Sequence, residues 1–123
     1  MKTDLQEIRT TLQGILKAHS PLLKVRVDTE KTFEIAGTIP AMQGKKKVDG
    51  YYFASVMPKP KDVRLYFFPI YTHVDQFSLS PDLKKYLKGK SCFHIKKLSP
   101  EIEEEIKTMI GKGVELYKKD ELI

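Results

Sequence analysis

The chain has 123 residues, a length that fits one domain and can bury a core without metals or disulfides. Its hydrophobic fraction of 41% excludes a disordered chain, and its single cysteine excludes an internal disulfide framework and indicates a reducing compartment. The formal net charge of +6 favours anionic partners over cation storage, although a lysine-rich solvated surface explains it equally well.

A helix is predicted over residues 3–18. Its apolar residues recur at three- and four-residue steps and form one stripe: Leu5, Ile8, Leu12, Ile15 and Leu16. Thr3 is placed to cap the free N–H groups at the start, and Pro21 prevents continuation. The hydrophobic period then changes to two, which predicts a β-hairpin with strands near 23–27 and 32–36.

The middle of the chain is predicted to hold a loop and two strands. Residues 39–50 contain glycines, a proline and three consecutive lysines, so we expect a mobile basic loop within the sheet. The strands 51–57 and 63–68 are rich in aromatic and β-branched residues. Both are apolar on both faces, whereas a strand wet on one side alternates more cleanly. We therefore expect a helix, a loop, a partner subunit or a ligand to cover the second face.

Two later helices each begin with a serine, a proline and an acidic residue in that order, a combination that favours a helix start. They are predicted to span 80–89 and 99–119, with a short strand at 91–96 between them. Gly113 falls on the apolar stripe of the last helix, which indicates close packing or a break there. The order α-β-β-β-β-α-β-α and the tight connections predict one α+β domain, with helices packed on a mostly antiparallel sheet of about five strands.

Several segments carry a family resemblance: GYYFAS at 50–55, LYFFPIY at 65–71, LKGKSCFHIKKL at 87–98, and Tyr117 with Lys118. Over roughly residues 45–119 the chain resembles the YdhG-like family of bacterial domains of unknown function. The resemblance implies a single domain over 1–123 with a curved antiparallel sheet. Some relatives are described as frataxin-like iron chaperones that hold iron through surface carboxylates. The resemblance alone thus implies iron as a cofactor, and we carry over no iron ligand, because the carboxylates here form no acidic ridge.

Cys92 and His94 share one face of the predicted strand 91–96. Such a pair suits an activated thiolate or half of a metal site. There is no second cysteine, and His19 and His73 lie in other segments without ligand spacing, so a small buried cysteine is the alternative.

The densest acidic run begins the last helix. Glu101 and Glu105 lie one helical turn apart, a spacing that suits weak cation binding. The alternative is that these carboxylates only compensate the positive end of the helix dipole and stay in water. No phosphate-binding loop, dinucleotide turn or nucleophile elbow occurs. We therefore predict no catalytic residue, no metal ligand and no cofactor from the residues themselves.

A basic and aromatic surface is the candidate ligand-binding site. If Phe93 and Ile95 face the core, the alternate residues of that strand face away and join those of its neighbours. The predicted ligand-binding residues are Tyr52, Arg64, Tyr66, Phe68, Cys92, His94 and Lys96. Cations suit an anion, and rings suit stacking or apolar contact.

We predict from this surface a non-enzymatic binding module for a small anionic or amphipathic ligand. The alternatives are a frataxin-like iron-binding protein, by resemblance only, and a homodimeric interaction protein that uses its doubly apolar sheet face. The absence of a helix-turn-helix, zinc finger or RNA-binding signature disfavours nucleic acid as a partner. We see no signal-peptide core and no run long enough to span a bilayer, so we expect a cytoplasmic protein without membrane contact.

Overall fold

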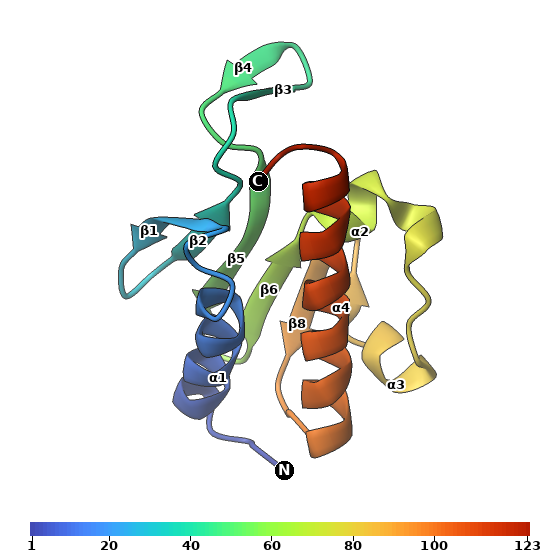
Figure 1. Cartoon of the computed structure of the whole chain (residues 1–123). Helices are drawn as coiled ribbons and strands as arrows, with labels where there is room; N and C mark the ends of the chain where they lie inside the picture. The colour runs from blue at the N-terminus through green and yellow to red at the C-terminus, as the bar shows by residue number, and fades with distance from the viewer.

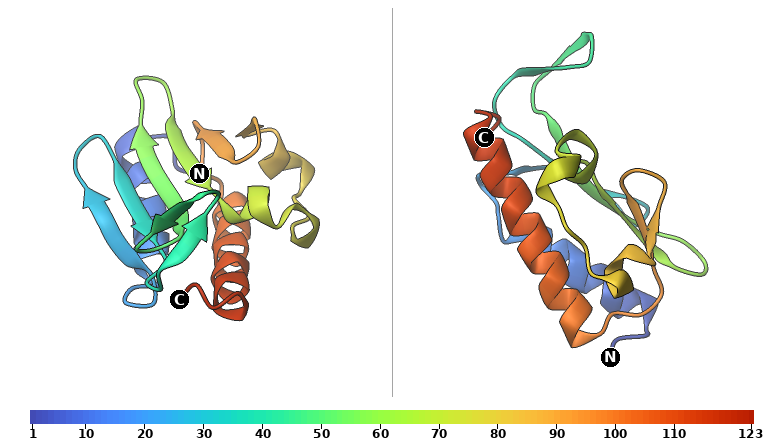
Figure 2. Two further views of the ribbon diagram at one scale, coloured as in Figure 1. Left: turned by 90° about the horizontal axis from the view of Figure 1, so that it is seen from above. Right: turned by 90° about the vertical axis from the view of Figure 1, so that its right-hand side faces the viewer.

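Six strands pair into one antiparallel sheet in the computed structural model, which covers residues 1–123. In spatial order they are β1 (Lys24–Asp28), β2 (Phe33–Ala36), β5 (Tyr52–Pro58), β6 (Val63–Phe67), β8 (Cys92–Ile95) and β7 (Leu87–Lys88). Helices α1 (Leu5–Lys17) and α4 (Pro100–Lys119) lie on one face of the sheet, and the opposite face carries no helix (Figures 1 and 2). The predicted α+β domain with a mostly antiparallel sheet is confirmed.

The core fills the layer between the sheet and the two long helices. The ring of Phe53 meets those of Phe67 and Tyr117 edge to face, with centroids 5.5 Å and 5.1 Å apart. Phe93 and Ile95 are fully buried on the same side, as the period of two predicts. The wholly buried Tyr117 donates its hydroxyl hydrogen to the carbonyl oxygen of Tyr52, which fixes α4 to β5.

The caps and the glycine of the helices follow local chemistry. Asp4 caps α1, because its carboxylate accepts the N–H of Gln6 at 3.0 Å, so the prediction of Thr3 as the cap is wrong by one residue. Ser99 caps α4 as predicted. A Cβ at Gly113 would lie 2.7 Å from Cζ of Phe67, so the glycine permits close packing and does not break the helix.

The predicted loop 39–50 is instead a separate hairpin, and the prediction is wrong there. Strands β3 (Ala41–Gln43) and β4 (Lys46–Val48) pair with each other and stand away from the main sheet (Figure 1). Gly44 adopts a φ of 65° in the tight turn between them, a conformation that glycine takes without strain. The hairpin contributes no residue to the buried core.

The predicted helix 80–89 is also wrong in length. Helix α3 covers only Pro81–Lys84, and the chain then forms β7 at the edge of the sheet. The carbonyl of Tyr86 accepts the N–H of His94 at 2.8 Å, so pairing with β8 replaces further helical turns. Before α3, residues 69–80 contain a short helix, α2 (Pro69–Thr72), and one 3₁₀ turn, η1 (Val74–Gln76), which the sequence reasoning left unassigned.

Candidate functional site

The helix-free face of the sheet brings most of the predicted ligand-binding residues together. In the register of β6 and β8, Arg64 lies opposite His94, and Tyr66 lies opposite Cys92. Tyr52 and Phe68 occupy the other end of this face, with ring centroids 5.5 Å apart. Lys96 follows the end of β8 and is exposed. The period of two therefore predicts correctly which residues share this face, whereas the register that sets their neighbours was not predicted.

Asp62 occupies the Arg64 end of the face, and sequence reasoning missed it. Its side chain is only 10% exposed, with Oδ1 3.3 Å from Nε of Arg64 and Oδ2 3.8 Å from Nδ1 of His94. The only signal in the sequence was an acidic residue in the turn before a strand. Because the Asp62 carboxylate already faces the Arg64 guanidinium, this end of the face has little net charge left to attract an anion.

Cys92 lacks the properties of an activated thiolate. Burial raises the pKa of its thiol, and hydrogen bonding to Tyr66 opposes that rise only in part. The thiol is therefore protonated at neutral pH, which disfavours the nucleophile alternative. No group of three or more His, Cys, Asp or Glu side chains lies close enough together to hold a metal ion.

The side chains at the aromatic end of the face contact one another. The Tyr52 hydroxyl donates to Oγ of Ser55 at 2.6 Å, and burial raises the pKa of Tyr52 to about 12. Ser55 is 1% exposed although no helix covers it, so neighbouring side chains shield Ser55 in place of a helix. None of the hollows described below is lined by Arg64, Tyr66 or His94.

A hollow lies beside the β7 edge of the sheet, and we call it the apolar hollow. Its volume is about 640 Å³, and its hydrophobic lining is Ile70, Tyr71, Val74, Phe77, Leu79 and Leu87. Lys84 and Lys90 also line it. Neither lysine belongs to any of the ion pairs of the structure, and Nζ of Lys90 lies 5.3 Å from the centroid of the Tyr71 ring.

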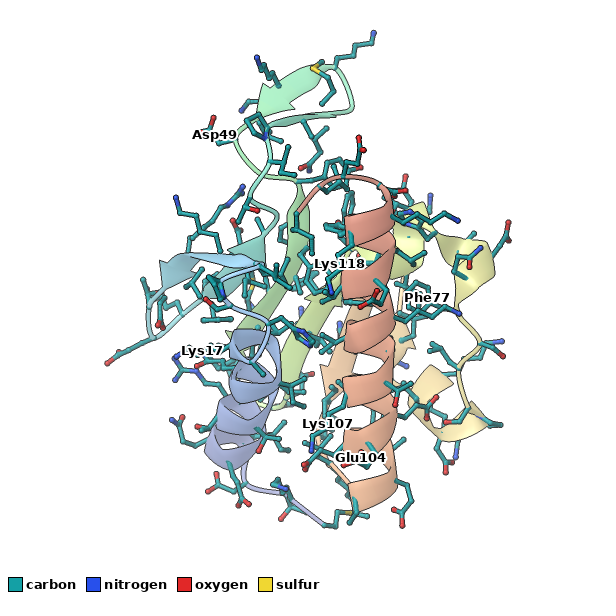
Figure 3. The ribbon with its side chains drawn as sticks, viewed as in Figure 1. Lys17, Asp49, Phe77, Glu104, Lys107 and Lys118 are labelled. Carbon is teal, nitrogen blue, oxygen red and sulfur yellow. The ribbon has the colours of Figure 1, made fainter.

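Contacts with α4 hold the outer wall of the apolar hollow. Ser80 donates its backbone N–H and its hydroxyl to the Glu105 carboxylate, at 2.8 Å and 2.5 Å. Phe77 packs edge to face on Phe67, with centroids 5.5 Å apart, and lies beside α4 on the side away from α1 (Figure 3). Sequence reasoning missed this site because residues 69–80 have no hydrophobic period, so nothing local predicts their path.

Most of the acidic run at the start of α4 is already paired. Glu103 binds the Lys2 ammonium at 2.6 Å, a contact that lowers the pKa of its carboxyl. Glu104 lies 3.2 Å from Lys107, its neighbour on the helix in Figure 3. With Glu105 bound to Ser80, this run offers no free pair of carboxylates one turn apart. The iron alternative therefore gains no support from these residues.

No protein-family model, curated protein or solved structure shows significant similarity to this chain. The YdhG-like resemblance therefore stays a prediction. No helix of the structure combines the length and the apolar character needed to cross a membrane.

Proposed function

We propose that the protein is a non-enzymatic binding module for small amphipathic anions, and that the apolar hollow receives them. The observation that carries this proposal is the pair of lysines without carboxylate partners, Lys84 and Lys90, beside six hydrophobic lining residues. A hollow of about 640 Å³ lies within the usual size range of small-molecule sites. The ligand class follows the sequence prediction, whereas the proposed place differs from the predicted one.

Physical chemistry favours a ligand with one apolar part and one anionic group. The apolar part would displace water from the side chains of Val74, Leu79 and Leu87, which gains free energy in proportion to the area covered. The anion would meet the ammonium groups at the edge of the hollow, where the surroundings are less polar than water. A purely polar anion gains only the second contribution, and a neutral apolar molecule gains only the first.

The test compares decanoate with decanol and acetate, which separate these two contributions. We expect decanoate to give saturable shifts of the amide NMR signals of Val74, Leu79 and Leu87, and to raise the melting temperature. Lys84→Gln with Lys90→Gln should weaken decanoate binding by about tenfold or more and leave decanol binding unchanged. Lys59→Gln with Lys61→Gln is the matched control, because it removes the same charge from the exposed turn between β5 and β6.

Two results would count against the proposal. If decanol bound as tightly as decanoate, the lysines would have no role in recognition. If decanoate shifted only signals near Arg64 and His94, the ligand would occupy the face predicted from sequence and not the apolar hollow.

A further inference from the structure

A second hollow lies at the root of the β3–β4 hairpin, and we call it the basic hollow. Its volume is about 840 Å³, and it is bounded by β1, by residues 37–40 and by the end of β4. Its charged lining residues are Lys24, Arg26, Lys46, Lys47 and Asp49. Asp49 is labelled at the hairpin root in Figure 3, above β1. Basic residues of two separate elements, β1 and β4, thus line one space.

The base of the basic hollow is fixed by close backbone contacts. A Cβ at Gly50 would lie 2.0 Å from the carbonyl oxygen of Gly37, and a Cβ at Gly37 would lie 2.5 Å from that of Leu122, so only glycine fits at both. Arg26 crosses this base, because its Nη1 donates to the carbonyl of Gly50 at 2.9 Å and its Nη2 lies 2.9 Å from Glu34. The base of the basic hollow is therefore held by close backbone contacts and by the Arg26 side chain.

The charges of the basic hollow do not balance. Glu34 is the partner of Arg26, whereas Lys24, Lys46 and Lys47 belong to none of the ion pairs of the structure. Asp49 is the only acidic residue of the lining. Like charges held around one space repel, and an anion of several charges would relieve that repulsion more than a single charge would.

We infer that the basic hollow binds a compact oligophosphate. This inference does not rest on the ligand proposed for the apolar hollow. The lining has only two hydrophobic residues, Val25 and Val48, so an acyl chain or an aromatic ring gains little there. Lysines recognise phosphate groups as point charges and impose little geometry, which suits several phosphates in a short row. The basic lining residues gather between β1 and the hairpin root and do not extend along a groove, which favours a compact ligand over a long strand.

The test uses inorganic tripolyphosphate, inorganic monophosphate and a single-stranded oligothymidine, each titrated by calorimetry and by amide NMR. We expect saturable tripolyphosphate binding that is about tenfold or more tighter than monophosphate binding and that weakens as salt is added. The shifted amide signals should be those of Gly37, Lys46 and Gly50.

The variant carries Lys24→Gln, Lys46→Gln and Lys47→Gln, all at exposed positions, so it should fold. It should lose about tenfold or more in tripolyphosphate affinity. The control carries Lys31→Gln, Lys59→Gln and Lys61→Gln, which lowers the net charge equally and should leave the affinity within about twofold. No saturable binding, equal losses in both variants, or binding of oligothymidine without binding of tripolyphosphate would each overturn the inference.

Discussion

Gly113 and Gly111 lie two residues apart in α4, yet their surroundings differ. A Cβ at Gly113 would press into the rings of Phe67 and Phe53, 2.7 Å and 3.2 Å away, whereas a Cβ at Gly111 would meet nothing within 4 Å. We expect Gly113→Ala to lower the free energy of unfolding by about 1–3 kcal/mol, because buried rings must shift. Gly111→Ala should raise it by about 0.5–1 kcal/mol through helix propensity.

Urea unfolding of the two glycine variants measures this difference. Both substitutions change the intrinsic helix propensity in the same way, so their opposite signs isolate the packing contribution. Equal stabilisation by both would show that α4 does not press on Phe67 as closely as the structure places it.

Cys92 should react slowly with alkylating reagents at neutral pH. Burial raises the pKa of its thiol, so the rate of reaction with iodoacetamide should rise with pH along a curve displaced above that of a free thiol. Because hydrogen bonding to Tyr66 lowers this pKa, Tyr66→Phe should displace the curve further upward. A steric block alone would slow the reaction without displacing the curve, and an undisplaced curve would contradict the prediction.

The same pKa shift links Cys92 to stability. The unfolded chain ionises its thiol at a lower pH than the folded protein does. The stability contributed by the protonated thiol is therefore fully present below the unfolded pKa and is lost as the pH rises through the folded pKa. Cys92→Ala should flatten the stability profile in that alkaline range, as urea midpoints measured across it would show.

At the scale of elements, Glu105 holds the segment before α3 against α4. Glu105→Ala removes the acceptor of both Ser80 hydrogen bonds, so we expect a loss of about 1–3 kcal/mol in unfolding free energy. Amide hydrogen exchange should rise at Ser78–Ser80, and decanoate affinity should fall because the wall of the apolar hollow loosens. Glu115→Ala is the control, since this exposed residue of α4 pairs only with Lys118. Unchanged exchange at Ser80 would contradict the assigned role.

Local chemistry in the sequence predicts where elements begin better than where they end. Ser80 and Pro81 do start a helix, but tertiary pairing with β8 stops it after one turn. In residues 39–50, the composition indicates a loop, whereas the structure has a two-residue turn at Gly44 flanked by residues that pair.

The candidate sites also show that local patterns in the sequence do not predict contacts made by tertiary structure. A period of two correctly places Arg64 and His94 on one face of the sheet, because the rule is local to each strand. Their position opposite each other depends on the register of β6 and β8, which no local pattern predicts. Nothing local predicts that Lys84 and Lys90 border an apolar hollow, because that depends on the path of residues 69–80 around the edge of the sheet.

At the scale of the whole molecule, the hairpin is separate from the core. Its strands contribute nothing to the buried cluster, and their ends lie together because Ala41 pairs with Val48. Replacing residues 41–48 by a short glycine–serine turn should therefore change the unfolding free energy by less than about 1 kcal/mol. The same variant should keep decanoate binding and lose tripolyphosphate binding. Loss of the native NMR spectrum would show instead that the hairpin is needed for folding.

Helix α4 supports both hollows at once. Near its beginning, Glu105 secures the wall of the apolar hollow. Just beyond its end, the carbonyl of Leu122 accepts the N–H groups of Thr38 and Ile39, at 3.1 Å and 3.3 Å, at the root of the hairpin. A ligand that displaced α4 along its axis would therefore alter the geometry at two distant places. If binding at one hollow displaces α4 in this way, thermodynamic linkage requires each ligand to change the affinity for the other by the same factor.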